Sequence, residues 1–157
     1  MVAVANDVEA TIAGLDLLGQ RIEDATRQIA ADMGHILQAE LMKTAPVGTP
    51  GNTTNAPGDL RRSMDFEGPY GSGAAYTGRV GPTVIYGRQR ALGGPIYAKV
   101  APALVFTKFG VIYRIAPPKF VTQMPNPFMQ RAYMQSMGKI ELDARARVTE
   151  AILGTTS

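Results

Sequence analysis

Apolar residues recur at helical spacing in the first third of the chain. Between Gly14 and Thr44 they follow one another mostly at steps of three and four residues, and charged side chains fall mostly on the other side. The positions are Leu15, Leu18, Ile22, Ile29, Met33, Ile36, Leu37 and Leu41. This is the period of one face of an α-helix. The pattern predicts a long amphipathic helix over residues 14–44 that ends before Pro46, with residues 1–12 loosely ordered.

A second helical pattern closes the sequence. Asn126 suits a helix N-cap, Pro127 suits the first helical position, and Gly154 is a stop signal. The apolar stripe between them comprises Met129, Tyr133, Met137, Ile140, Ala144, Val148 and Ile152. Two acid-before-base pairs lie four residues apart on the polar side, Glu141 with Arg145 and Asp143 with Arg147. We expect a helix over residues 126–153.

Between the helices the pattern changes to short β-branched and aromatic runs cut by glycine and proline. The runs are Ala75–Gly81, Val84–Leu92, Ala103–Thr107 and Val111–Ile115. In the second run Tyr86, Arg88 and Arg90 alternate, which would place them on one face of a strand. We expect residues 64–122 to form a small antiparallel sheet of about four to five strands. With the two helices packed on it, the chain is predicted to be a single α+β domain.

Residues 46–58 have the composition of a long loop, with three prolines, three glycines and two asparagines in thirteen residues. Loops of this length are either functional or mobile. The residues considered for partner contact are Val47, Thr49, Asn52, Thr53 and Asn55. Asp59 follows as an N-cap candidate for a short helical turn that carries Arg61 and Arg62.

Composition sets broad limits on what the protein can be. The chain has 157 residues, of which 45% are hydrophobic and 18% charged, as in ordinary globular domains. The absence of cysteine excludes disulfides and thiolate metal sites. No apolar run approaches the roughly 18 residues of a membrane span, and the first residues lack the pattern of a secretory signal. We therefore expect a soluble protein made in the cytoplasm.

Charge is distributed unevenly along the chain. Residues 1–45 carry 7 acidic and 3 basic side chains, a net of −4, whereas residues 46–133 carry 3 acidic and 10 basic ones, a net of +7. A basic bias of this kind can mark a surface near a polyanion. A solvated sheet face without acidic partners explains it equally well.

No catalytic, cofactor or metal constellation is apparent. His35 is the only histidine, and no cysteine or second histidine could complete a zinc site with it. The glycines between Gly68 and Gly78 lack the Lys-Ser/Thr ending of a phosphate-binding loop, so a hairpin turn is the better interpretation. An enzyme is the least favoured class, because positioned acid, base or nucleophile partners are missing.

The order of these elements resembles the neck and tail-completion family of long-tailed bacteriophages, the small minor tail components of lambda-like phages. The resemblance spans about residues 15–150. It is carried by Ala45-Pro46-Val47, Gly58-Asp59-Leu60-Arg61-Arg62-Ser63-Met64, Val80-Gly81, Ile85-Tyr86-Gly87, Leu92-Gly93-Gly94, Leu104-Val105-Phe106 and Pro125-Asn126-Pro127-Phe128-Met129. Relatives commonly have Tyr-Ala and an acidic residue before the glycine pair, where this chain has Tyr86-Gly87 and Gln89-Arg90-Ala91.

This resemblance implies a structural virion protein at the head–tail junction, with no enzymatic activity. It implies a cyclic homo-oligomer, a hexamer by analogy with tail symmetry, around a channel that DNA crosses without sequence-specific contacts. Its other partners would be phage neck and tail proteins: the connector, the tail terminator or tube, and the tape measure. It would reside in the virion and, during assembly, in the host cytoplasm. The residues expected to face a neighbouring subunit or the channel are Arg61, Arg62, Arg79, Arg88, Arg90 and Lys99.

Two other interpretations remain open at this point. A small nucleic-acid-binding module would use the same basic residues, and its affinity for DNA would fall steeply with salt. A tail terminator or a head–tail connector layer would also be soluble, ring-forming and poor in cysteine.

Overall fold

The computed structural model describes residues 2–48, 56–97, 104–108, 111–115 and 120–154. By their contacts, the residues divide into two compact units. Unit 1 comprises Met1–Ile36, Phe66–Arg79 and Ser136–Ser157, and unit 2 comprises Leu37–Asp65 and Val80–Gln135. The two long helices and the first hairpin each contribute residues to both units.

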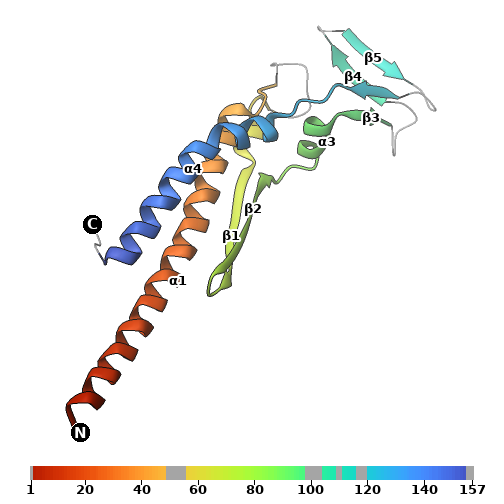
Figure 1. Ribbon diagram of the computed structural model, residues 1–157. Helices are drawn as coiled ribbons and strands as arrows, with labels where there is room; N and C mark the ends of the chain where they lie inside the picture. Colours follow the sequence, from red (N-terminus) through yellow and green to blue (C-terminus); the bar gives the residue numbers. More distant parts are fainter. Residues whose placement is uncertain (1, 49–55, 98–103, 109–110, 116–119, 155–157) are drawn as a thin grey trace. The chain divides into compact units, whose positions relative to one another are not determined.

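The described residues form four helices and six short strands, with a long helix at each end of the order (Figure 1). In chain order the elements are α1 (Val2–Thr44), α2 (Asp59–Arg62), β1 (Met64–Ser72), β2 (Ala75–Pro82), α3 (Tyr86–Leu92), β3 (Gly94–Ile96), β4 (Leu104–Lys108), β5 (Val111–Ile115), β6 (Val121–Gln123) and α4 (Phe128–Leu153). The predicted α+β class, with a long N-terminal and a C-terminal helix, is confirmed.

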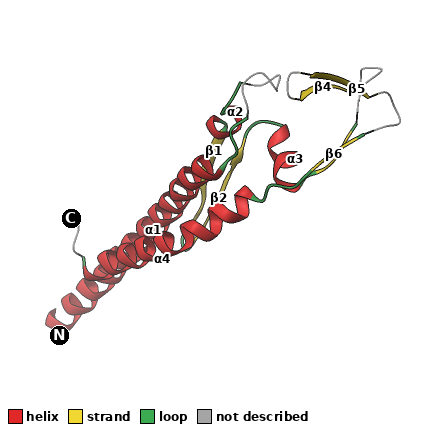
Figure 2. Ribbon diagram, turned by 90° about the horizontal axis from the view of Figure 1, so that it is seen from above, coloured by secondary structure: helices red, strands yellow, loops and turns green. Residues whose placement is uncertain are grey.

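The strands pair two by two, and in this respect the structure differs from the predicted sheet of four to five strands. The ladders are β1–β2 and β4–β5, which Figure 2 labels, and β3–β6. Strand β4 pairs antiparallel with β5 from Leu104 opposite Ile115 to Lys108 opposite Val111, as predicted for a hairpin. Strand β3 pairs with the distant β6 instead of with a sequence neighbour. Glycine and proline between the runs break the region into separate ladders.

Helix α1 begins at Val2, so the prediction that residues 1–12 are loosely ordered was wrong. Residues 2–13 include four alanines, and alanine is the strongest helix former. The helix has 43 residues and ends at Thr44, where the sequence predicted its end.

The predicted strand Val84–Leu92 is also wrong, because Tyr86–Leu92 forms helix α3. Arginine, glutamine, alanine and leucine, which fill its second half, all favour helices. Gly93 ends the helix with φ 70°, a left-handed conformation that suits glycine. The helical turn buries Gly87 and Ala91 and leaves Arg88 on an exposed face.

The core of unit 2 gathers around Phe128, whose side chain is completely buried. Its buried neighbours are Leu41, Ala45, Leu60, Met64, Ala91 and Ala132. Hydrogen bonds lie beside this cluster. Gln38 Nε2 donates to the carbonyl of Met64 at 2.9 Å, and Thr44 Oγ1 donates to the carbonyl of Phe128 at 3.3 Å. The end of α1 is thereby held to α4 within unit 2.

In unit 1, α1 lies beside α4 and the β1–β2 hairpin. Arg147 on α4 places Nη2 at 3.2 Å from Oδ2 of Asp32 on α1, in place of the predicted pair with Asp143. The ring of Phe66 on β1 lies against Gly34, where any Cβ would collide with it. His35 meets the same ring edge-on, with centroids 5.1 Å apart. Gly34, which weakens an isolated helix, is therefore required for the hairpin to pack here.

Two helix starts differ from the predictions. Gly58, with φ 86°, precedes α2, and Asp59 is the first residue of that helix instead of its cap. Helix α4 begins at Phe128, two residues later than predicted. The side chain of Asn126 accepts a hydrogen bond from Arg131 Nη2 at 2.6 Å. The predicted end at Leu153 and the ion pair of Glu141 with Arg145 are both present.

Candidate functional site

Arg61 is engaged within unit 2. Its Nη2 donates to the carbonyls of Lys43 and Ala45, each at 3.2 Å. These carbonyls lie at the C-terminal end of α1, where the last backbone acceptors lack helical partners and the helix dipole favours a cation. Arg61 therefore has a structural role in closing α1, which accounts for it without a neighbouring subunit.

Arg62 is paired with Asp59 by a hydrogen bond from Nη2 to Oδ1. Both lie on α2, beside a small pocket of about 160 Å³. Asp59, Leu60, Tyr86, Arg90 and Gln123 line it, together with Pro46, Gly48, Ala56 and Gly58. Burial raises the pKa of Tyr86, and the charge of Asp59 adds to this increase.

This pocket is too small for a typical organic ligand. Ligand sites usually enclose about 300–1,000 Å³. Gln123 Nε2 is a buried donor without a protein partner, and a space of this size holds a few waters that could satisfy it. The pocket is therefore better explained as hydration than as a substrate site.

Arg88 and Arg90 are the exposed basic residues of α3. No hydrogen bond or ion pair is seen for either guanidinium among the described residues. Ile85, just before α3, is 99% exposed, and Leu92, its last residue, is 66% exposed. Ile85, Arg88 and Leu92 follow one another at steps of three and four residues, so they share one side of the helix. We call these three residues the α3 outer face.

The other candidate residues are placed as follows. Arg79, on β2 in unit 1, is exposed. Val47 is 51% exposed at the start of the predicted loop. Lys99, Thr49, Asn52, Thr53 and Asn55 lie outside the described residues. The structure thus brings Arg88 and Arg90 together on one short helix, while Arg61 and Arg62 are engaged within unit 2.

Exposed apolar stripes on the long helices are the feature that sequence reasoning misinterpreted. On α4 the buried positions are Phe128, Ala132, Ser136 and Ile140, at steps of four residues. Of the predicted stripe, Ile140 is buried, but Tyr133, Met137, Val148 and Ile152 are exposed. Small side chains at 132 and 136 allow close packing, so the buried seam shifted around the helix. Met137, Val148 and Ile152 of the predicted stripe are therefore exposed.

On α1 the difference between the predicted apolar face and the observed burial is larger than on α4. Every residue from Asp7 to Leu17 is exposed, including Val8, Ile12 and Leu15. We call residues 7–17 the exposed segment. The described end of α4 reaches α1 near Arg21, where a Cβ on Gly154 would come within 2.9 Å of the guanidinium. The amphipathic pattern predicted this helix, but it gave no indication that residues 7–17 are exposed.

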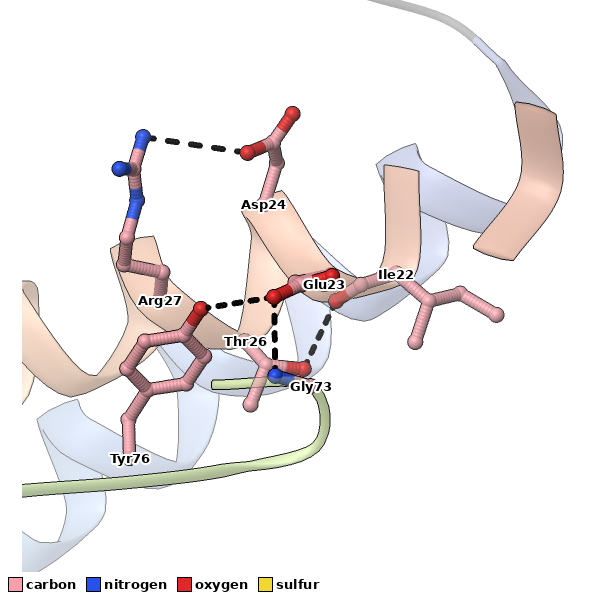
Figure 3. Close-up of polar contacts among 7 residues, drawn as sticks. All are labelled: Ile22, Glu23, Asp24, Thr26, Arg27, Gly73 and Tyr76. Atoms are coloured by element: carbon pink, nitrogen blue, oxygen red, sulfur yellow. Dashed lines mark hydrogen bonds and ion pairs between the residues drawn. The ribbon is translucent and has the colours of Figure 1, made fainter. Parts of the chain in front are cut away.

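The tip of the β1–β2 hairpin is fastened to α1 by Glu23 (Figure 3). Its Oε1 accepts hydrogen bonds from the backbone N–H of Gly73 at 2.8 Å and from the hydroxyl of Tyr76 at 3.2 Å. Burial raises the pKa of Tyr76, and the hydrogen bond to the Glu23 carboxylate raises it further. These two hydrogen bonds hold the hairpin tip against α1. The contact is explained by this structural role.

Grooves between α1 and α4 in unit 1 are polar and open. Asp32, His35, Arg147 and Glu150 line one, and Arg21, Asp24, Gln28 and Arg147 are among those lining another. Arg147 is already paired with Asp32 and lies 3.9 Å from Glu150. Among the described residues there is no group of three or more histidine, aspartate or glutamate side chains placed to hold a metal ion.

Within the described part of the chain, no helix combines the length and hydropathy needed to cross a bilayer. Comparison of the chain with protein-family models, curated proteins and solved structures gives no match.

Proposed function

We propose that this protein is a structural virion component of the bacteriophage head–tail junction that assembles into a ring around the DNA channel. The observation that carries the proposal is unburied apolar surface. On α1, Val8, Ile12 and Leu15 are 52%, 54% and 63% exposed, and on α4, Val148 and Ile152 are 47% and 61% exposed.

The location of this surface supports assembly over catalysis. It lies on helices, as stripes at helical spacing on α1 and α4, and such patches typically mark protein–protein interfaces. The described pockets are small or open, and the charged residues that line them include Asp32 and Arg147, which pair with each other. The proposed role as neck or tail-completion protein rests on the resemblance in element order described above.

Solution mass and particle shape test the proposal. Light scattering after size exclusion, across concentration, should give a multiple of 16.8 kDa that rises to a closed ring, and electron microscopy should show annular particles with a central opening. The hexamer follows from the analogy with tail symmetry. A protein that remains monomeric at millimolar concentration contradicts the ring.

A nucleic-acid-binding module is the second candidate, favoured by the exposed Arg79, Arg88 and Arg90. It predicts that the monomer binds duplex DNA, with affinity that falls about linearly on a logarithmic salt scale as phosphate contacts release counterions. A ring subunit with a channel that merely tolerates DNA would bind weakly as a monomer. Fluorescence anisotropy at two salt concentrations separates the two candidates.

A further inference from the structure

We propose that the exposed segment of α1 docks on the α3 outer face of a second copy of this chain. The inference rests on the proposed ring and assigns one of its contacts. The segment is helical, and Val8, Ile12 and Leu15 form its apolar line at steps of four and three residues. A single unpacked helix of about this length is only marginally stable in water. The apolar line is therefore suited to packing against another surface.

Acidic residues border this apolar line. Asp7 and Glu9 flank Val8, and Asp16 follows Leu15. Adjacent residues lie about 100° apart around a helix, so the carboxylates lie at the sides of the line instead of within it. No basic residue precedes Arg21. The exposed segment is therefore an apolar line with negative edges.

The α3 outer face has the opposite charge. Its ends are the exposed Ile85 and Leu92, with Arg88 between them. Arg90, two residues after Arg88, lies on the other side of the helix and lines the small pocket. Neither guanidinium has a described partner that would compete for an incoming carboxylate. An apolar line edged by carboxylates and an apolar face carrying Arg88 are complementary in both chemistry and sign.

Charge also favours a contact between the exposed segment and the α3 outer face over a contact between two exposed segments. Pairing of two exposed segments in parallel would bring Asp7, Glu9 and Asp16 against their own copies, and like charges at close range are unfavourable. A contact between different surfaces of two identical chains avoids this. It is heterologous, and heterologous contacts close into rings when the rotation permits.

The experiment exchanges the two charges. The first variant is Asp7→Lys with Asp16→Lys, and the second is Arg88→Glu. When either variant is present alone, its exposed segment and its α3 outer face carry charges of the same sign and repel at every contact. We therefore expect its assembly to require a protein concentration on the order of a hundredfold higher than that of wild type. An equimolar mixture restores opposite charge at every contact in an alternating ring, and should assemble at wild-type concentration. Sedimentation velocity gives the readout.

The mixture also shows that the contact is between chains, because a contact within one chain cannot be repaired by a second variant. Glu67→Lys with Glu141→Lys, which changes the net charge as the first variant does at other exposed positions, should assemble as wild type. If wild type forms rings and both variants assemble equally well, or if the mixture stays dissociated, this contact is wrong while the ring proposal stands. If wild type never assembles, both proposals fail.

Discussion

The two ends of α1 share one helix and one hydrophobic period but differ completely in burial. Near its C-terminal end Leu41 is 3% exposed and lies in the unit 2 core. In the exposed segment Leu15 is 63% exposed with no described cover. The pattern of apolar positions thus reports that a face is suited to burial, but it does not report which molecule buries it. Substitutions along α1 and its contacts can test this distinction.

The largest effect is expected in the core that holds the buried end. Phe128→Ala removes a side chain with no exposure and leaves a cavity, which should lower the free energy of unfolding by about 3–5 kcal/mol. Urea denaturation followed by circular dichroism measures it. Met134→Ala, on the same helix but 65% exposed, should change the free energy by less than about 0.5 kcal/mol. Equal effects at 128 and 134 would mean that this core does not exist.

A smaller loss is expected where α1 ends. Arg61→Ala removes the two hydrogen bonds to the carbonyls of Lys43 and Ala45 and should cost about 1–2 kcal/mol of unfolding free energy. Arg62→Ala breaks only an exposed ion pair with Asp59, worth about 0–1 kcal/mol. A larger loss for Arg62 than for Arg61 would contradict the assignment of Arg61 to helix closure.

These contacts show what the sequence could and could not predict. Helical periods and stop signals located α1 and α4 because they depend on local spacing, and the β4–β5 hairpin followed from two short runs and a turn. The pairing of β3 with β6 is non-local, so no local pattern announces it. Helix α3 was missed because Val84, Ile85 and Tyr86 favour strands, whereas the following residues favour a helix.

The candidate site was less predictable than the fold. Arg61 and Arg62 are adjacent and basic in the sequence, yet one closes a helix and the other pairs with Asp59. Nothing in the sequence separates them from Arg88 and Arg90, since the difference lies in which carbonyls and carboxylates the fold brings near. Exposure of the α1 stripe likewise depends on where α4 ends.

The contact between Glu23, in the middle of α1, and Tyr76 on β2 can be tested through the ionisation of the Tyr76 hydroxyl. Glu23→Gln removes the carboxylate that raises the pKa of the Tyr76 hydroxyl, so this pKa should fall towards its ordinary value. Because the folded-state pKa is raised, the stability linked to Tyr76 is present below pH about 10 and is lost as the pH rises through the folded pKa. The loss at high pH should be smaller in the variant.

Absorbance titration at alkaline pH, with Tyr76→Phe as the reference that identifies the Tyr76 signal among six tyrosines, measures the pKa. The associated stability change should be smaller than that for Arg61→Ala, because the group lies near the surface. An unchanged Tyr76 pKa in Glu23→Gln would rule out the hydrogen bond at the hairpin tip.

The smallest effect on the free energy of unfolding is expected in the exposed segment. A substitution there tests most directly how the exposed end of α1 differs from its buried end. Leu15→Ala removes an exposed side chain and substitutes the strongest helix former, so the unfolding free energy of the monomer should change by less than about 0.5 kcal/mol. In a docked segment the same truncation removes an anchoring side chain worth about 1–2 kcal/mol. The concentration needed for assembly should then rise about tenfold.

Leu17→Ala is the matched control, since Leu17 is 48% exposed but lies off the line formed by Val8, Ile12 and Leu15. If the exposed segment packs through that line, sedimentation should separate Leu15→Ala from Leu17→Ala while denaturation does not. Equal weakening of assembly by both would point to a general need for helix hydrophobicity. Weakening by neither would mean that the apolar pattern of the exposed end, unlike that of the buried end, has no partner surface in the assembly.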